Sequence, residues 1–413
     1  MAQIKPFMAV RPVEKLADRV AALPYDVYNR QEAKREVERE PLSFLKIDRA
    51  ETQFPDEVDT YDPCVYQKAA ELLAEMKKDG VYVSDPDHAY YIYRLTMDGR
   101  AQTGIVACAS VDDYLDNVIK KHENTREEKE QDRIRHVDTL SAQTGPIFLA
   151  YRSKEEINEV VASVMEKEAP LYDFTAVDGI SHTVWKVSEA DQVKTIQDTF
   201  AGIDNIYIAD GHHRAASAVK VGIKRRQEHP GYDGTEEFNY FLSVLFPDDQ
   251  LMIMDYNRVV RDLNGLSTED FLKKTEEIFT VSELGDKAQS PQRKGQFTMY
   301  LEGKWYLLEA SPEMLGESDA VKSLDVSLLQ EYLLEPVLGI HDPRTDDRID
   351  FVGGIRGLEE LERRAGTDMK VAFAMYPTSI AELFAVADAG LLMPPKSTWF
   401  EPKLRSGLFI HEI

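Results

Sequence analysis

One stretch of the chain decides how its polar residues are presented: Asn205-Ile206-Tyr207-Ile208-Ala209-Asp210-Gly211-His212-His213-Arg214-Ala215-Ala216-Ser217-Ala218-Val219. Its first part, 205–209, is short, apolar and β-leaning, whereas its last part is an alanine-rich helix pattern. The stretch therefore predicts a strand that runs through a tight turn into a helix. Free N–H groups at the start of such a helix, together with its dipole, favour an anion. Gly211 would let the backbone approach that anion without a Cβ clash.

The side chains of this turn suit a phosphate ligand. His213 and Arg214 supply donors for phosphate oxygens, and Asp210 stands at the strand end, where a carboxylate can hold Mg²⁺ or a hydroxyl. One alternative is an Asp-Gly turn followed by two surface histidines. A zinc site is another, although adjacent histidines do not easily point at one metal and no third ligand has a recognisable spacing. Neither a Walker A sequence nor G-x-G-x-x-G occurs.

A second polar group precedes this stretch at Lys121-His122-Glu123-Asn124-Thr125. Thr125 and Glu128 have capping-box spacing, which predicts a helix over 126–140. Ile134, Val137 and Leu140 mark its apolar stripe, so its other faces are expected in solvent. A carboxylate at Glu123, just before the helix, can act as a general base. A solvated acidic loop followed by a helix cap explains the same residues equally well.

A third group is Met393-Pro394-Pro395-Lys396-Ser397-Thr398-Trp399-Phe400. Two prolines stiffen the backbone. Lys396, Ser397 and Thr398 then present a cation and two hydroxyls, which suit a carboxylate or phosphate, and Lys403 and Arg405 extend the positive patch. A basic C-terminal loop without a ligand is the alternative. The acidic run 346–350 is interpreted as a solvated turn, with a metal site as the less favoured alternative.

The remaining patterns predict a mixed α/β fold. Helices are expected at 62–78, at 154–167 with Ser153 and Glu156 as a capping box, and around 271–278 and 326–334. Strands are expected at 88–95 and 104–110 around a hairpin turn at 97–100, at 183–187, at 238–246 and 251–254 around the turn 247–249, at 296–301, 305–309 and 408–410.

These patterns divide the chain into four parts. Residues 1–115 form an N-terminal α/β subdomain, and 116–265 form a catalytic core with the first two polar groups. Residues 266–390 form another α/β subdomain, and 391–413 form a loop and strand that return to the active site.

Composition limits the partners and the compartment. The 413 residues carry a net charge of -25, which repels DNA phosphates, so no nucleic-acid partner is expected. Two cysteines, Cys64 and Cys108, favour a reducing compartment over a disulfide scaffold. The N-terminus does not look like a signal peptide, and no run of about 18 apolar residues occurs. A cytoplasmic protein without a membrane segment is expected.

The three polar groups resemble those of a bacterial and archaeal family labelled as a domain of unknown function, DUF1015. The turn from Gly211 to Ala216 also resembles the phosphate-binding turn of ParB-type partition proteins and sulfiredoxins. The nearest functional resemblance is to free serine kinases of that superfamily. These show a His-Glu pair, then Asp-Gly-His-His-Arg, then a C-terminal Pro-Lys-Thr-Thr loop. This chain is much longer, and its loop has Lys-Ser-Thr-Trp where the kinases have Lys-Thr-Thr-Arg.

The resemblance implies a ParB/sulfiredoxin-like catalytic core that transfers a phosphoryl group from ATP or ADP, with Mg²⁺, to a small hydroxyl compound such as free serine. Glu123 would be the base, and Asp210 would assist transfer and hold the metal. The phosphate cradle would comprise Gly211, His212, His213 and Arg214. The acceptor would be held by His122, Lys396, Ser397 and Thr398.

This kinase interpretation has three rivals. A ParB-like protein that binds or hydrolyses nucleotide and regulates a partner would show no acceptor-dependent turnover. A DNA clamp would need a basic surface and a dimerisation segment, neither of which is visible. A sulfiredoxin-like reductase would need a cysteine where His212 stands.

Overall fold

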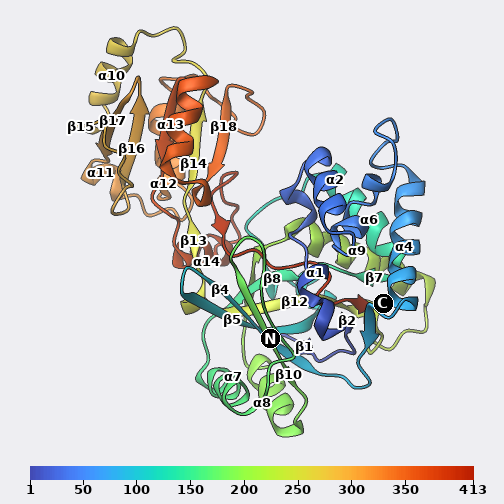
Figure 1. Cartoon of the computed structure of the whole chain (residues 1–413). Helices are drawn as coiled ribbons and strands as arrows, with labels where there is room; N and C mark the ends of the chain where they lie inside the picture. The colour runs from blue at the N-terminus through green and yellow to red at the C-terminus, as the bar shows by residue number, and fades with distance from the viewer. The chain divides into compact units, whose positions relative to one another are not determined.

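The computed structural model describes all 413 residues, which form two compact units (Figure 1). Unit 1 comprises Met1–Leu251 and Pro402–Ile413, and unit 2 comprises Met252–Glu401. The chain therefore leaves unit 1, builds unit 2, and returns to unit 1 for its last residues.

A nine-stranded mixed sheet forms the centre of unit 1, in the order β6-β11-β8-β12-β5-β4-β10-β9, with β1 also paired to β5. β12 runs parallel to β8, and β11 parallel to β6, while the other pairs are antiparallel. The strands are β1 (Ile4–Lys5), β4 (Tyr90–Met97), β5 (Arg100–Ser110), β6 (Ile119–Lys120), β8 (Ile147–Tyr151), β9 (Tyr172–Thr175), β10 (Ser181–Val187), β11 (Ile206–Asp210) and β12 (Tyr240–Pro247). Segments 1–115 and 116–265 thus contribute to one sheet. The predicted hairpin at 97–100 is confirmed.

Some helices of unit 1 pack against this sheet, and others form a second core. They are α1 (Ala17–Val20), α2 (Arg30–Arg39), α3 (Leu45–Asp48), α4 (Pro63–Lys78), α5 (Val111–Leu115), α6 (Glu127–Leu140), α7 (Glu155–Lys167), α8 (Ala190–Phe200) and α9 (His212–Glu228). Alternate residues of the strands share one apolar core with α7, α8 and α9. A second core lies among α2, α3 and α4, and it includes Ile410 from the end of the chain. Two short pairs, β2 (Val10–Pro12) with β3 (Tyr82–Ser84) and β7 (Ala142–Gln143) with β21 (His411–Glu412), complete unit 1.

Two predicted capping boxes are wrong. α6 begins after Arg126 without a side-chain cap, because the Thr125 hydroxyl donates to Glu130, 2.7 Å away, instead of accepting from the helix backbone. α7 begins after Lys154, also without a side-chain cap, so Ser153 and Glu156 do not form a box. The spacing alone does not specify a cap, since the Ser or Thr must also stand at the last non-helical residue.

The expectation that α6 exposes all but an apolar stripe is also wrong. Its buried residues are Glu130, Asp132, Arg133 and His136, whereas Ile134, Val137 and Leu140 are only partly buried. A charged face of the helix is therefore packed inside unit 1, against α4 and α9.

Unit 2 is a six-stranded antiparallel sheet in the order β15-β17-β16-β19-β14-β18. Its strands are β14 (Tyr256–Val260), β15 (Thr280–Gly285), β16 (Gln296–Leu301), β17 (Lys304–Glu309), β18 (Ile349–Gly353) and β19 (Val371–Ala374). Its helices are α10 (Thr268–Glu276), α11 (Pro312–Leu315), α12 (Asp325–Leu329), α13 (Gly357–Thr367) and α14 (Ile380–Asp388), with a π-helical turn at Gln330–Leu334. Trp305 and Leu361 lie in its core.

The strands predicted around the turn at 247–249 do not form a hairpin. β12 ends at Pro247, and β13 (Ile253–Met254) belongs to unit 2, where it pairs with β20 (Trp399–Phe400). None of the helices is both long and apolar enough to cross a membrane.

Candidate active site

The centre of the candidate site is the junction of β11 and α9 in unit 1, where the predicted strand, turn and helix are confirmed. Gly211 has a φ of 96°, in the left-handed region, and is the residue before the helix. Because glycine has no side chain that could accept a hydrogen bond, the first N–H groups of the 17-residue helix are not capped by this residue. Such groups, with the positive end of the helix dipole, form a site for an anion.

Glycine is required at this turn for two reasons. A residue with a Cβ is strained at a positive φ. A Cβ on Gly211 would also lie 3.0 Å from Nε and from Nη2 of Arg214, whose guanidinium folds back over the turn.

Asp210, at the end of β11, is flanked by two cations. The Arg214 guanidinium donates to its carboxylate at 3.3 Å, and the Lys403 ammonium lies 3.7 Å away. Burial by itself would raise the pKa of Asp210, but the charges of Lys403 and Arg214 outweigh it and hold that pKa below the ordinary value. The carboxylate therefore stays ionised while 36% of the side chain is exposed.

Arg214 also donates to the carbonyl oxygen of Pro146 at 2.5 Å. Its guanidinium ties the end of β11 to the segment before β8. Arg214 thus organises the turn in this structure, and any contact with a phosphate would be an additional role.

His212 links the turn to the segment with Glu123. The backbone N–H of His122 points at Nε2 of His212 over 3.5 Å, which leaves the proton of the neutral ring on Nδ1. Nδ1 lies 3.6 Å from a Glu123 carboxylate oxygen. Burial lowers the pKa of His212 to about 4, so the ring is neutral at pH 7 and lies beside Glu123 without forming an ion pair with it. The two predicted catalytic carboxylates, Glu123 and Asp210, are therefore on adjoining segments.

His122 lies deeper, with 1% of its surface exposed. Its ring meets that of His212 edge to face, with centroids 4.5 Å apart. Neither ring nitrogen has a hydrogen-bond partner, although the backbone of Ile208 lies nearby. Burial, with the neighbouring His212, lowers the pKa of His122 to about 3. A role of His122 in holding an acceptor stays a prediction.

His213 turns away from His212. Its Nε2 accepts from the backbone N–H of Arg126 at 2.9 Å and so fixes the start of α6. Burial lowers the pKa of His213. The two histidines therefore do not share a ligand, and no group of three His, Cys, Asp or Glu residues that could hold a metal ion occurs.

The third polar group belongs to unit 2. Lys396 has a φ of 58°, its carbonyl accepts from Arg258 at 3.2 Å, and its ammonium lies 5.5 Å above the Tyr256 ring. The hydroxyl of Ser397 donates to the Pro394 carbonyl at 2.7 Å, so it stabilises the loop itself. Thr398 is partly buried. Convergence of Lys396, Ser397 and Thr398 with Asp210 stays a prediction.

Two features of unit 1 differ from the sequence-based expectation. Lys403 is expected to extend the positive patch of the C-terminal loop, whereas it lies beside Asp210, and no sequence signal connects residues so far apart. Arg405 is not part of a patch either. It is buried, donates to Nε2 of His182 at 3.1 Å and forms an ion pair with Asp178 at 2.5 Å.

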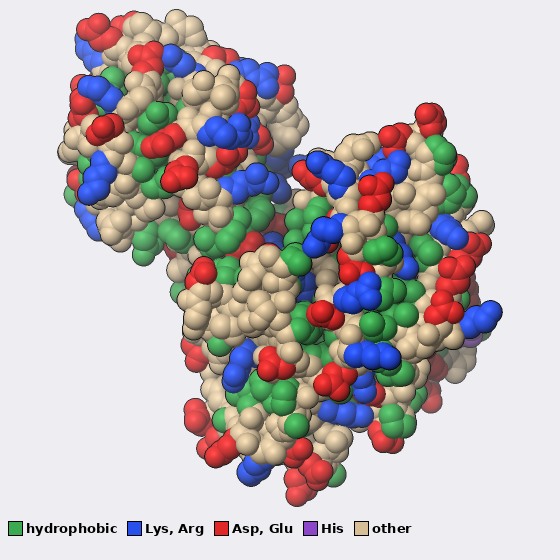
Figure 2. Space-filling view, in the orientation of Figure 1, with side chains coloured by type: hydrophobic (Ala, Val, Ile, Leu, Met, Phe, Trp, Pro, Cys, Tyr) green, Lys and Arg blue, Asp and Glu red, His purple; other side chains and the backbone are tan.

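Charges are mixed on the surface. On the face drawn in Figure 2, basic and acidic side chains alternate over both units and form no continuous basic stripe.

A family model described as "Protein of unknown function (DUF1015)" matches residues 4–327. No curated protein matches the chain. A free serine kinase in complex with AMP is 13% identical, with a TM-score of 0.35 over 73% of this chain and 91% of that one. SbnI with a C-terminal truncation, from Staphylococcus aureus, is 12% identical, with a TM-score of 0.37 over 73% and 85%. A conserved hypothetical protein from Pyrococcus furiosus is 14% identical, with a TM-score of 0.34 over 74% and 94%.

Proposed function

The chain belongs to the DUF1015 family of proteins of unknown function, and we propose that it is a phosphotransferase that moves the terminal phosphoryl group of ATP or ADP to a small hydroxyl compound. The observation that carries this proposal is the uncapped start of α9, entered through Gly211 and adjoined by Asp210 and Glu123. It brings together an anion site and two carboxylates, Asp210 at the end of β11 and Glu123 just after the neighbouring parallel strand β6.

The nucleotide's phosphates would bind the first N–H groups of α9. Phosphoryl transfer requires positioning and charge neutralisation more than covalent catalysis, which fits a site made of backbone donors, Lys403 and Arg214. The acceptor oxygen would attack the terminal phosphorus, the bond from that phosphorus to the bridging oxygen would break, and the hydroxyl proton would pass to Glu123. His212 would position Glu123 through its Nδ1–H.

Mg²⁺ would neutralise charge on the phosphates. Asp210 is one carboxylate between two cations, so it offers a single protein ligand, and phosphate oxygens and water would supply the rest, as is common for this ion. The acceptor is proposed to be an amino acid such as free serine, held by His122, Lys396, Ser397 and Thr398. A ParB/sulfiredoxin-like core is proposed for the part of unit 1 around β11 and α9.

The test combines Glu123→Gln with an acceptor screen. The substitution keeps the shape and removes the base, so acceptor-stimulated nucleotide consumption should fall about 10²–10⁴-fold while ADP affinity, measured by calorimetry, changes little. Glu128→Gln, an exposed residue at the start of α6, is the matched control and should retain the wild-type rate.

Three outcomes separate the alternatives. A Glu123→Gln protein with the wild-type rate would exclude Glu123 as the base. Nucleotide binding without any acceptor-stimulated turnover would favour the ParB-like regulatory protein. Absence of ADP and ATP binding would refute the proposed function altogether.

A further inference from the structure

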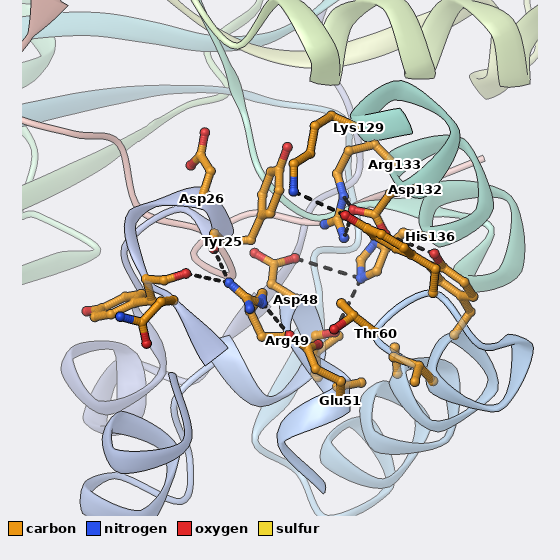
Figure 3. Close-up of a pocket in the computed structure, with 18 residues that line it drawn as sticks. Tyr25, Asp26, Asp48, Arg49, Glu51, Thr60, Lys129, Asp132, Arg133 and His136 are labelled. Carbon is orange, nitrogen blue, oxygen red and sulfur yellow. Dashed lines mark hydrogen bonds and ion pairs between the residues drawn. The ribbon is translucent and has the colours of Figure 1, made fainter. Parts of the chain in front are cut away.

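The charged face of α6 lines a cavity of about 300 Å³ inside unit 1 (Figure 3). Its walls also come from the turn at Tyr25–Val27, from α3 and α4, and from the 3-10 turn at Ala50–Gln53. This volume is at the lower end of the range of small-molecule sites, about 300–1,000 Å³. No part of the proposed phosphotransferase mechanism uses it.

The wall contains two ion pairs, and within each pair the two partners neutralise each other's charge. Arg49 bonds to Glu51 at 2.5 Å and also donates to two backbone carbonyls. Arg133 bonds to Asp132 at 2.8 Å. Asp132 accepts a further hydrogen bond from the Tyr66 hydroxyl at 2.9 Å. These side chains have little capacity left for a ligand.

Asp48 is the remaining buried acid, and it shares the charge of Arg133 with Asp132 instead of forming an ion pair of its own with an arginine or lysine. The residue is 5% exposed, and it points into the space between Tyr25, Arg49 and His136 in Figure 3. One of its oxygens, Oδ1, accepts from the Thr144 hydroxyl at 3.2 Å, and Oδ2 has no hydrogen-bond partner. The wall therefore buries three carboxylates with two guanidinium groups, and the third cation that lines it, Lys129, is exposed and donates to the Tyr61 hydroxyl at 3.2 Å.

His136 does not supply the missing positive charge. Its Nε2 lies 3.8 Å from Asp48 and 3.3 Å from the Ile47 carbonyl. Burial, and next the charge of Arg133, lower the pKa of His136 to about 4, so the ring is neutral at pH 7. An uncompensated buried carboxylate is unfavourable, and a bound cation would relieve that cost.

We propose that this cavity binds a small organic cation whose primary ammonium group donates to Oδ2 of Asp48. A metal ion is not the occupant that fits, because the cavity is larger than an ion needs and no three metal-ligating side chains converge. An anion is disfavoured by the surplus of buried carboxylates. The rings of Tyr25, Tyr61 and Tyr66 in the wall suit the apolar part of an amine. Arg133 and Lys129 already lie over the rings of Tyr25 and Tyr61, so the ammonium group is assigned to Asp48.

The cavity adjoins the candidate active site. A smaller cavity of about 30 Å³ shares Tyr25, Asp48, Arg133 and His136 with it and reaches Arg214. The amine site is nevertheless separate from the helix start of α9, and it does not depend on the proposed phosphotransferase activity.

The experiment is calorimetric titration of the full-length protein with propylamine, propanol and propionate, which share a chain and differ in charge. Propylamine should bind saturably, with a Kd of about 0.1–10 mM for so small a ligand, and the other two should not. Equal binding of propylamine and propanol, or no binding of propylamine, would overturn the proposal. This comparison needs no variant.

Two substitutions locate the site. Asp48→Asn keeps the shape and the Thr144 contact, and should weaken propylamine binding about 10–100-fold, the range for a lost charge-assisted hydrogen bond. Asp26→Asn removes an exposed carboxylate at the rim and should leave the affinity within about 2-fold. Undiminished binding by a folded Asp48→Asn protein would contradict the assignment. ADP titration of each variant reports on α9 separately.

Discussion

Replacing Gly211 with alanine tests the geometry of the turn directly. The φ of 96° costs a residue with a Cβ about 1–2 kcal/mol. The new methyl would also lie 3.0 Å from two guanidinium nitrogens of Arg214, which has to move and so weakens its bond to the Pro146 carbonyl. A charge-assisted bond contributes about 1.5–3 kcal/mol, so its partial loss adds about 1 kcal/mol. We expect a total loss of about 2–3 kcal/mol.

Gly80→Ala is the matched control. Gly80 has a φ of 73° at the end of α4, with nothing within 4 Å of an added Cβ, so this variant carries the backbone strain alone. At about 2–4 °C per kcal/mol, Gly211→Ala should melt about 4–12 °C below the wild type and Gly80→Ala about 2–8 °C below it. ADP affinity should fall about 10-fold only for Gly211→Ala. Equal melting temperatures and equal ADP affinities in the two variants would refute the described arrangement of Arg214 and the anion site.

Two further predictions concern pH. His122, His136, His182 and His212 are buried with pKa values lowered to about 3–4, so below the ordinary value of 6.5 the unfolded chain binds protons that the folded chain does not, and stability falls as pH falls. Between pH 6.5 and pH 5, the free energy of unfolding measured in urea should fall about 1.5–2 kcal/mol less for His122→Leu than for the wild type. An equal fall in the two proteins would argue against a neutral His122. The pKa of Asp210 is lower in the folded chain than in the unfolded chain. The stability that this difference provides is present above the unfolded-state pKa and is lost as the pH falls through the folded-state pKa. Lys403→Ala raises that pKa and should move acid unfolding, followed by circular dichroism, to higher pH, whereas Lys194→Ala, which removes an exposed ion pair with Asp198, should not.

The local parts of the fold could be predicted from the sequence. β11, the turn at Gly211 and α9 follow from an apolar run, a glycine and an alanine-rich segment that are contiguous. The hairpin of β4 and β5 follows for the same reason, because its turn and its alternating strands are neighbours in the chain.

The buried charges of α6 could not be predicted. Asp132 and His136 are solvent-facing by helical periodicity, and they are buried only because Tyr66 and Asp48 come from segments far away in the sequence. The same holds for Lys403 beside Asp210. Such contacts depend on tertiary packing, which neither propensity nor motif spacing encodes.

The return of the chain from unit 2 to unit 1 has a consequence for synthesis on the ribosome. Asp210 and α9 emerge early, but Lys403, which adjoins the Asp210 carboxylate, is translated only after the whole of unit 2. Ile410 and the strand β21 follow later still, and they close the second core and pair with β7. A nascent chain therefore carries the start of α9 without its last cation, and the candidate site is completed only when the final segment has docked.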